Sequence, residues 1–353
     1  MKLIHLYLRN FRNFENAQIS FHPKANLIHG LNAQGKTNLL EAIYFLSTGR
    51  SFRSSHPTEL IQHGKPHFYL EAHFEKEGIP QEVSVSFDGK IKKVKYNQTY
   101  YSNFSQLLGL LPTVLYTPQD VALILGSPSI RRKFLDMHIA QVDPLYIHHL
   151  VRYYKALKQR NCLLRQKSME GIDVWEEALS LSASYITEKR EIAIKELDEP
   201  LKNWMLRLSP QGETLDLLYQ PVCTSKEIPS IVEQYKKQRS KEMHLGNTLV
   251  GPHRDDIEIC IDQRPARIFS SEGQKRCAIG ALRLAEWGRL RNIVEAPPLM
   301  SIDDFGVHLD GKRQNLFQDE IQELGQVFIT SPFALPNFKD HLAIHIEAGA
   351  MLP

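Results

Sequence analysis

The chain has 353 residues, which is enough for one large domain or for two lobes with substantial cores. With 42% hydrophobic and 24% charged residues, it has the composition of an ordinary globular protein. Its 43 basic and 40 acidic residues give a net charge of +3, so any nucleic-acid contact must come from a local patch and not from overall charge.

The four cysteines are scattered, without a C-x-x-C pair. This argues against a zinc ribbon or a disulfide framework and fits a reducing cytoplasm. The first ten residues alternate polar and apolar and lack the core of a signal peptide. No apolar run approaches the ~20 residues needed to cross a bilayer. We expect a cytoplasmic protein that does not span a membrane, although docking onto a membrane partner stays open.

The N-terminal segment predicts strands that are followed by a glycine-containing turn and a helix. Residues 3–8 and 17–21 alternate as half-buried strands, and the apolar run 25–29 predicts a buried strand. The next eight residues fit G-x-x-x-x-G-K-[ST], the phosphate-binding P-loop. From residue 37 the pattern predicts an amphipathic helix that ends near Gly49.

The P-loop chemistry follows from this order of elements. A strand, a Gly-containing turn and a helix leave backbone N–H groups free at the helix N-terminus, where the dipole favours an anion. Lys36 would reach the β- and γ-phosphates of ATP, and the Thr37 hydroxyl would ligate Mg²⁺. The predicted nucleotide-binding residues are Gly30, Leu31, Asn32, Ala33, Gln34, Gly35, Lys36 and Thr37.

The middle of the chain changes from strands to helices. Residues 67–97 predict a three-stranded meander and residues 113–116 a short strand. From 128 to 208 the periodicity is helical, with a turn near 168–171, and Pro200 is expected to interrupt the second helix. We expect an antiparallel helix pair here, whereas residues 209–250 yield no clear assignment.

The C-terminal part returns to alternating strands and helices. Strands are predicted at 257–261, 297–302, 326–330 and 342–346. Helices are predicted from 273 to 294 and from 312 to 324.

A carboxylate pair follows the predicted strand 297–302. A P-loop needs such an acid for Mg²⁺ at the end of a buried strand. Asp303 would act on the metal side through water, and Asp304 would polarise the attacking water. Taken alone, the pair could also be a helix cap or a turn. Nearly the whole chain separates it from the P-loop, so the core would be closed by both termini.

Residues 270–274 resemble the signature loop of ABC-class ATPases. They read S-x-G-Q at the start of a helix, where Ser271, Gly273 and Gln274 would meet the γ-phosphate held by an opposite subunit. A simple capping segment is the alternative. Leu309 and Asp310 would form the D-loop, and Gln119 is a candidate for the Q-loop glutamine.

With these elements placed, the chain resembles the RecF family of SMC-like ABC ATPases over essentially its full length. The start 8–14 is similar to the family opening, and segments 118–136 and 248–256 resemble its two specific signatures. The expected ~40-residue helices would span about 60 Å, far shorter than SMC arms.

The chain departs from the family pattern at three places. Val307-His308-Leu309-Asp310 stands where Ser-Glu-Leu-Asp is usual in the D-loop. Gln119 stands where an acid is expected, and no histidine follows strand 326–330, where Thr330 lies.

The resemblance implies an ABC-type P-loop ATPase head: an α/β fold with a mixed sheet lobe around the P-loop and an inserted helical lobe. We expect the ATPase lobe at 1–118 and 248–353 and the helical lobe at 119–247, with the signature loop 270–274 at the lobe interface. The implied cofactors are ATP and Mg²⁺, with Lys36, Gln119 and Asp304 as catalytic residues.

The implied function is recombinational repair and replication-fork maintenance. ATP would drive homodimerisation on single-stranded, gapped or junction DNA, with weak DNA-stimulated ATP hydrolysis. The family further implies RecA loading with RecO and RecR, RecR contact, and support for SOS induction. Candidate phosphate or DNA contacts are Arg53, Arg131, Arg132 and Arg254. The basic helix around Arg160 is read either as a solvated face or as a DNA contact.

Three alternatives remain open on the sequence alone. One is a non-catalytic scaffold that holds ATP on DNA, which the altered D-loop favours. The others are another ABC-class ATPase, such as a transporter subunit, and a small-molecule P-loop kinase, in which S-x-G-Q would have no role.

Overall fold

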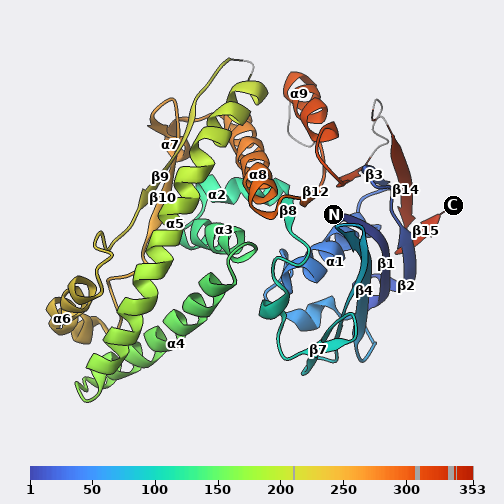
Figure 1. Ribbon diagram of the computed structural model, residues 1–353. Helices are drawn as coiled ribbons and strands as arrows, with labels where there is room; N and C mark the ends of the chain where they lie inside the picture. Colours follow the sequence, from blue (N-terminus) through green and yellow to red (C-terminus); the bar gives the residue numbers. More distant parts are fainter. Residues whose placement is uncertain (210, 307–310, 333–337, 339, 353) are drawn as a thin grey trace. The chain divides into compact units, whose positions relative to one another are not determined.

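The computed structural model describes residues 1–209, 211–306, 311–332, 338 and 340–352 (Figure 1). The chain divides into two compact units. The first comprises Met1–Asp120, Trp204–Gly212 and Ser271–Pro353, and the second Val121–Asn203 and Glu213–Ser270. Both ends of the chain therefore build one unit. Relative to the expected boundaries, residues 248–270 lie in the second unit, and residues 119–120 and 204–212 lie in the first.

The first unit contains a six-stranded antiparallel sheet of order β2-β1-β4-β5-β6-β7. Side chains alternate between a buried and a solvent-facing side, as along β4, because successive residues of a strand point to opposite faces. The strands are β1 (Lys2–Phe11), β2 (Phe14–Ser20), β4 (Phe68–Lys76), β5 (Ile79–Phe87), β6 (Lys92–Tyr96) and β7 (Thr99–Tyr101).

A second six-stranded sheet has the order β15-β14-β3-β13-β12-β8, and only its β15–β14 pair is antiparallel. Its inner strands are continuous apolar runs because both faces of a parallel sheet are covered. The strands are β3 (Ala25–His29), β8 (Thr113–Tyr116), β12 (Leu299–Ile302), β13 (Val327–Ser331), β14 (His341–Glu347) and β15 (Ala350–Leu352).

Helix α1 (Lys36–Thr48) packs between these two sheets. One hydrophobic cluster joins Leu39 and Ile43 of α1 to Leu70 of the antiparallel sheet and to Ile28 and Phe328 of the parallel sheet. The packing therefore holds the start of α1 directly after β3. The unit also contains α8 (Glu272–Val294), α9 (Gly311–Gln322) and the short turns η1 (Pro57–Leu60) and η2 (Phe104–Leu107).

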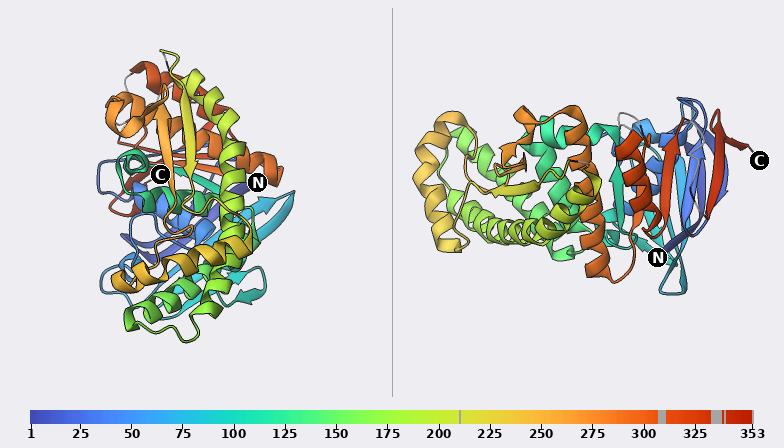
Figure 2. Two further views of the ribbon diagram at one scale, coloured as in Figure 1. Left: turned by 90° about the vertical axis from the view of Figure 1, so that its left-hand side faces the viewer. Right: turned by 90° about the horizontal axis from the view of Figure 1, so that it is seen from above.

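The second unit is mainly helical, with a small sheet of order β11-β10-β9. Its α4 and α5 meet near the turn that joins them (Figures 1 and 2). The elements are α2 (Ala122–Leu125), α3 (Pro128–Ala140), α4 (Pro144–Gln166), α5 (Ile172–Leu208), α6 (Ile228–Leu245), α7 (Ala266–Phe269), β9 (Leu215–Gln220), β10 (Asp256–Ile261) and β11 (Arg264–Pro265); η3 (Pro118–Val121) precedes them.

Helix α5 corrects one expectation, because it continues through Pro200. A proline removes one N–H and crowds the preceding turn. Leu197 and Leu201 on either side are fully buried, so packing holds the helix together there. At 37 residues the helix is about 55 Å long.

The unassigned segment 209–250 contains β9 and α6. Helix α6 has Pro229 in its first turn and Gly246 in the left-handed conformation at its end. These are the usual boundary residues of a helix, so the sequence did carry a signal here. Among the described residues, no helix has the length and apolar character that crossing a bilayer requires.

A buried ion network joins three helices of the second unit. The Arg160 guanidinium on α4 lies 2.9 Å from Glu176 of α5 and 2.7 Å from Glu242 of α6, and all three side chains are fully buried. Arg160 therefore belongs to the core and not to a basic DNA-facing surface.

His253 gives the second unit a pH-dependent stability. Its Nε2 lies 3.0 Å from the Thr248 carbonyl oxygen, and Tyr153 Oη lies 2.6 Å from Nδ1, as suits a neutral imidazole. Burial lowers the pKa of His253 from 6.5 to about 4. The unfolded chain therefore binds more protons between these values, and the free energy of unfolding should fall as pH drops from 6.5 to 4, by up to about 3 kcal/mol.

Urea unfolding at pH 7, 5.5 and 4.5 measures this effect. The His253→Gln variant should lose that part of the pH dependence, whereas replacement of the exposed His244 by glutamine should retain it. Identical pH profiles for wild type and His253→Gln would contradict the assignment.

Candidate phosphate site at the P-loop

The predicted P-loop joins β3 to α1, as expected. Gly30 and Gly35 have φ of 143° and 122°, a region that glycine tolerates. A Cβ at Gly30 would lie 2.3 Å from the Ile346 carbonyl oxygen, so no larger residue fits. Helix α1 begins with Gly35 as its cap, and no side chain of the described residues caps that end. Its first N–H groups are therefore available for an anion.

Lys36 folds back over this loop. Its Nζ donates to the carbonyl oxygens of Gly30 at 2.7 Å and Leu31 at 2.9 Å, and the residue is 4% exposed. Burial lowers the pKa of Lys36, while the carboxylates of Asp304 and Asp303 oppose that shift. The ammonium group thus lies inside the loop, where a phosphate would replace the carbonyl partners.

The two ends of the chain meet at Thr37 and Asp303. The Thr37 hydroxyl donates to Asp303 Oδ1 at 2.9 Å, across 266 positions of sequence. Thr330 of β13, which lies between β3 and β12, donates to the same oxygen at 2.7 Å. Burial raises the pKa of Asp303, and the hydrogen bonds from Thr330 and Thr37 oppose that shift. The sequence did not predict the role of Thr330, since it depends on strand order.

Asp304 has a strained backbone. Its φ is 49°, and its N–H donates to the Thr330 hydroxyl at 2.8 Å. Non-glycine residues held in this region often mark functional sites. The side chain is half-buried and lies near the Lys36 charge.

The predicted signature loop starts α8. Ser271 is exposed and caps the helix: its Oγ accepts from the Gln274 N–H at 3.2 Å, and Gln274 Oε1 accepts from the Ser271 N–H at 2.7 Å. A Cβ at Gly273 would lie 2.6 Å from Arg313 Nη1. The loop is thus a complete capping box on an accessible surface. The predicted D-loop residues 307–310, Asp310 among them, lie outside the described residues.

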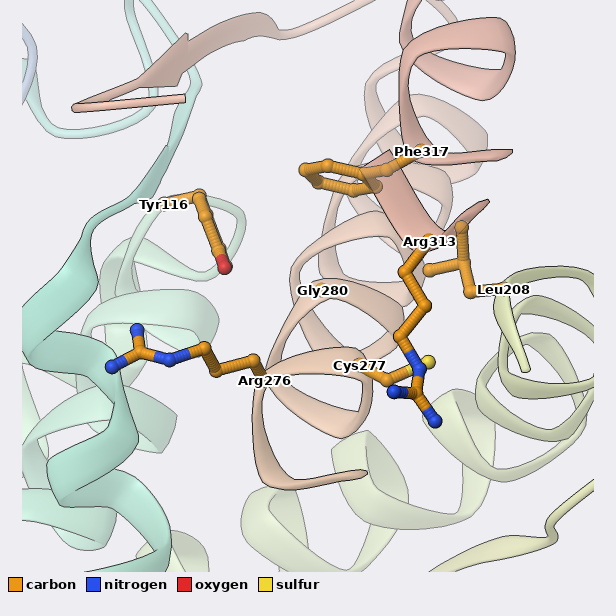
Figure 3. A pocket seen from close by; sticks show the side chains of 7 residues that line it. All are labelled: Tyr116, Leu208, Arg276, Cys277, Gly280, Arg313 and Phe317. Atoms are coloured by element: carbon orange, nitrogen blue, oxygen red, sulfur yellow. The ribbon is translucent and has the colours of Figure 1, made fainter. Parts of the chain in front are cut away.

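A small pocket lies beside α8, one turn beyond this loop (Figure 3). The Phe317 ring and the Tyr116 side chain flank it, the Arg313 guanidinium lies beside Cys277, and the Arg276 side chain points away from these residues (Figure 3). Arg276 also pairs with Glu272 at 2.9 Å. The pocket does not include the P-loop. Its lining residues are Tyr116, Leu208, Arg276, Cys277, Gly280, Arg313 and Phe317.

Gln119, the Q-loop candidate, is exposed in η3, and its neighbour Asp120 is the structurally engaged residue. Asp120 accepts two hydrogen bonds from Arg283 of α8, at 3.1 and 2.8 Å, and another from the Thr117 N–H at 2.9 Å. A pair with this bidentate geometry fixes η3 to α8. The family pattern led us to expect an acid at position 119, where this chain has Gln119. The acid that pairs with Arg283 is the next residue, Asp120.

The four candidate phosphate or DNA contacts differ in their environments. Arg131 is buried and bidentate with Asp256, at 2.7 and 2.9 Å, so its guanidinium is not free for DNA and that expectation is corrected. Arg132 is half-buried and donates to the Asp255 carbonyl at 2.6 Å. Arg254 and Arg53 are exposed.

The two family-like segments 118–136 and 248–256 meet at Arg190 of α5. Its guanidinium lies 2.8 Å from Asp136 Oδ1 and 3.1 Å from Asp255 Oδ2, and it donates to the Pro252 carbonyl at 2.7 Å. These motif carboxylates are therefore part of the core of the second unit.

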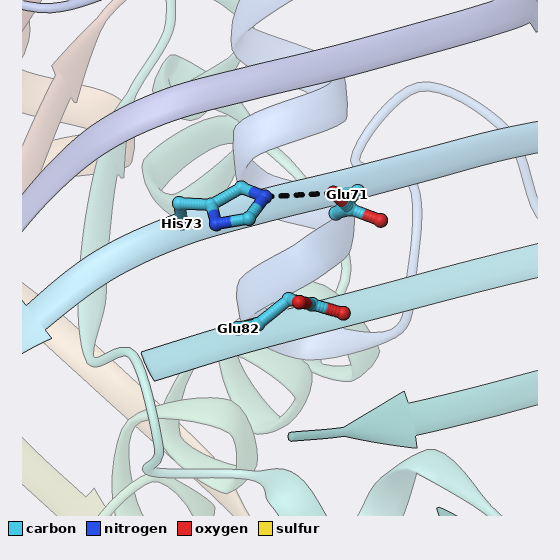
Figure 4. A group of neighbouring side chains, drawn as sticks. All are labelled: Glu71, His73 and Glu82. Carbon is cyan, nitrogen blue, oxygen red and sulfur yellow. Dashed lines mark hydrogen bonds and ion pairs between the residues drawn. The ribbon is translucent and has the colours of Figure 1, made fainter. Parts of the chain in front are cut away.

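A further cluster of titratable side chains lies on the side of the antiparallel sheet that faces away from α1 (Figure 4). His73 Nε2 lies 2.7 Å from Glu71 Oε1, and Lys95 Nζ lies 3.6 Å from Glu82 Oε1. Tyr69 donates to the second Glu71 oxygen. The carboxylates thus have partners within the sheet, and we interpret the cluster as a surface polar network.

A P-loop, a strand-end carboxylate and a helix with an exposed S-x-G-Q cap, built from both ends of one chain, define the ATPase-head class of P-loop proteins. Residues 2–334 match the family model described as RecF/RecN/SMC N terminal domain. The chain belongs to this family, and within it to the RecF proteins.

Relatives of known name match the sequence of this chain over nearly its full length. The chain is 46% identical to the DNA replication and repair protein RecF of Protochlamydia amoebophila (strain UWE25), covering 97% of this chain and 96% of that relative. It is 41% identical to the RecF of Chlamydia caviae, covering 94% and 92%.

Solved structures also resemble the fold of this chain. A structure described as the recombination mediator protein RecF-ATPrS in the RecFOR pathway matches with a TM-score of 0.90 and 31% identity, covering 99% of this chain and 97% of that one. An Smc head bound to the C-winged helix domain of ScpA matches with a TM-score of 0.58 and 16% identity, which bears on the fold alone. The predicted fold class and the RecF resemblance are confirmed.

Proposed function

We propose that this chain is an ATP-dependent DNA-binding protein of recombinational repair and replication. The observation that carries the proposal is the hydrogen bond between Thr37 and Asp303, which joins the P-loop to the strand-end carboxylate. Support comes from relatives named DNA replication and repair protein RecF and from the RecF-ATP structure of the RecFOR pathway, which is 30% identical. We assign the first unit as the ATPase lobe and the second as the helical lobe.

ATP would bind with its phosphates on the N–H groups of residues 30–37, and Lys36 would exchange its carbonyl partners for phosphate oxygens. The hydroxyl of Thr37 and the carboxylate of Asp303 are hard oxygen donors 2.9 Å apart, which suits Mg²⁺. When bound, Mg²⁺ neutralises phosphate charge. Asp304 would orient the attacking water, with Gln119 as the second candidate.

The ATP site would be completed by a second copy of the chain. Ser271, Gly273 and Gln274 of one subunit would contact the γ-phosphate of the other. In the single chain Ser271 Oγ accepts a hydrogen bond from the Gln274 N–H, so the hydroxyl can still donate to a phosphate oxygen while the cap is kept. ATP would thus act as the link between two heads, and hydrolysis would release them. Turnover would be slow because the monomer lacks half of the site.

DNA would bind mainly through its phosphates, so affinity would fall with salt. Arg53, Arg132 and Arg254 remain the candidate contacts. We further propose that RecR is the direct partner, with RecO and RecA acting in the same pathway and SOS induction as a consequence. Release of phosphate stimulated by DNA would separate this ATPase from a scaffold that holds ATP without hydrolysis.

ATP-dependent dimerisation tests the composite site. Wild type should form a dimer with a non-hydrolysable ATP analogue, and Ser271→Ala should bind nucleotide but remain monomeric. Light scattering coupled to gel filtration measures the mass, and equilibrium titration measures binding.

Loss of a helix cap alone could weaken α8 by about 1 kcal/mol. The Ser271→Asp variant controls for this because aspartate caps as well as serine but repels a phosphate. A Ser271→Asp protein that dimerises with ATP as wild type does would refute the trans contact.

A further inference from the structure

The turn of the C-terminal hairpin forms hydrogen bonds with the P-loop at Gln34. The turn between β14 and β15 consists of Ala348 and Gly349, and the flanking residues Glu347 and Ala350 pair. The Ala348 N–H donates to Gln34 Oε1 at 2.6 Å, and the Gly349 N–H donates to the Gln34 carbonyl oxygen at 2.9 Å.

Asn13 makes the second half of this contact. Its Nδ2 donates to the same Gln34 carbonyl oxygen at 2.7 Å, and its Oδ1 accepts from Asn38 of α1 at 2.7 Å. A Cβ at Gly35 would lie 2.8 Å from Asn13 Nδ2. Three segments far apart in sequence, the β1–β2 turn, the P-loop and the C-terminal turn, are thus joined through one peptide group.

The orientation of that peptide group matters for anion binding. The Gln34 carbonyl and the Gly35 N–H belong to the same planar, trans peptide unit and therefore point in opposite directions. Because the carbonyl is held by Gly349 and Asn13, the Gly35 N–H must point away from both. Without these two donors the peptide could rotate and the N–H would turn away from the phosphate side of the loop.

The hairpin turn is also strained and tightly fitted. Ala348 and Gly349 have φ of 48° and 75°, as a type I′ turn requires, although alanine is not a preferred residue there. A Cβ at Gly349 would lie 2.2 Å from the Asn13 carbonyl oxygen. Any side chain at Gly349 would force the turn off the P-loop.

We propose that the Ala348–Gly349 turn and Asn13 are positioning elements that hold the Gln34–Gly35 peptide in its phosphate-binding orientation. The inference rests on the proposed ATP site and deepens it. The C-terminal hairpin acts on nucleotide affinity through Gln34, without contacting the nucleotide.

The test compares two glycines in equivalent turns. Gly349→Ala should displace the turn from Gln34. Gly78→Ala is the matched control: the β4–β5 turn Glu77–Gly78 also has two positive φ values, of 54° and 77°, but a Cβ at Gly78 meets nothing within 4 Å. Equilibrium titration of a fluorescent ATP analogue with Mg²⁺ gives the dissociation constant, and the melting temperature without nucleotide reports the cost to folding.

Loss of one or two hydrogen bonds in the clamp should weaken nucleotide binding of Gly349→Ala about tenfold relative to Gly78→Ala. The melting temperature of Gly349→Ala without nucleotide should be the lower of the two, because its Cβ clashes with the Asn13 carbonyl oxygen, so the affinities are compared at a temperature where both variants are folded. Equal nucleotide affinity of the two variants would overturn the inference.

If Gly349→Ala does not fold, Asn13→Ala decides, since it removes one of the two donors to the Gln34 carbonyl oxygen. It too should bind about tenfold more weakly than wild type, and wild-type affinity would overturn the inference. A wild-type chain that binds no nucleotide would instead refute the proposed ATP site on which the inference rests.

Discussion

Replacement of Lys36 by methionine should abolish nucleotide binding by this chain. The ammonium group lies inside the P-loop, held by the carbonyl oxygens of Gly30 and Leu31, where phosphate oxygens would take their place. Methionine keeps the length of the side chain but provides no charge. Hydrogen bonds to charged groups contribute about 1.5–3 kcal/mol each, so the dissociation constant for ATP should rise at least about 100-fold.

The measurement is equilibrium titration with labelled ATP, and Lys24→Met is the matched control. Lys24 precedes β3, is well exposed and pairs with Asp340 at 2.8 Å, so its loss should leave ATP affinity unchanged. The Lys36→Met protein should fold, since it no longer buries an ammonium group. Wild-type affinity in Lys36→Met would mean that the loop is a structural turn and not the phosphate site.

Local sequence was sufficient to predict the elements around this lysine. The apolar run of β3, the glycines at 30 and 35 and the amphipathic start of α1 lie within 25 consecutive positions, and each has a short-range physical cause. The strand ending at Asp303 was predictable for the same reason. That Asp303 meets Thr37 followed from the consensus chemistry of a P-loop, and the hydrogen bond between them agrees with it.

The contributions of Thr330, Asn13 and Gly349 could not be predicted from sequence. Thr330 acts because β13 lies between β3 and β12, and strand order is a tertiary property. Gly349 acts because β14 pairs with β3 and brings a turn from the end of the chain to Gln34. None of these residues has a local pattern that distinguishes it from an ordinary turn or strand residue.

The burial of two arginines was also not predicted from the sequence. Arg131 and Arg160 were expected at the surface because charged side chains are rarely buried unless they are paired. Their partners, Asp256 and Glu242, lie far along the chain, so the pairing is not visible locally. The family-like segments 118–136 and 248–256 were the best indication in the sequence that charged residues are buried. Charged residues in a fixed motif can form a core network as well as a binding site.

Replacement of Arg190 by methionine should lower the free energy of unfolding of this chain by about 3–5 kcal/mol. The guanidinium is 1% exposed and compensates two carboxylates, Asp136 and Asp255, as well as the Pro252 carbonyl. Methionine has a similar length, so the variant leaves the buried carboxylate of Asp255 and the partly buried carboxylate of Asp136 without their cation. Breaking a buried ion pair in this way costs about 3–5 kcal/mol, which should appear as a large shift of the urea midpoint of unfolding.

Lys189→Met is the control at the adjacent position of α5. Lys189 pairs with Asp143 at 3.4 Å but is one-third exposed, and a pair of this kind contributes at most about 1 kcal/mol. Adding Asp255→Asn to Arg190→Met should restore part of the loss, because it removes one of the uncompensated charges. If Arg190→Met were no less stable than Lys189→Met, segments 118–136 and 248–256 would not be joined by a structural ion network, and their charged residues would have to be reconsidered as a binding surface.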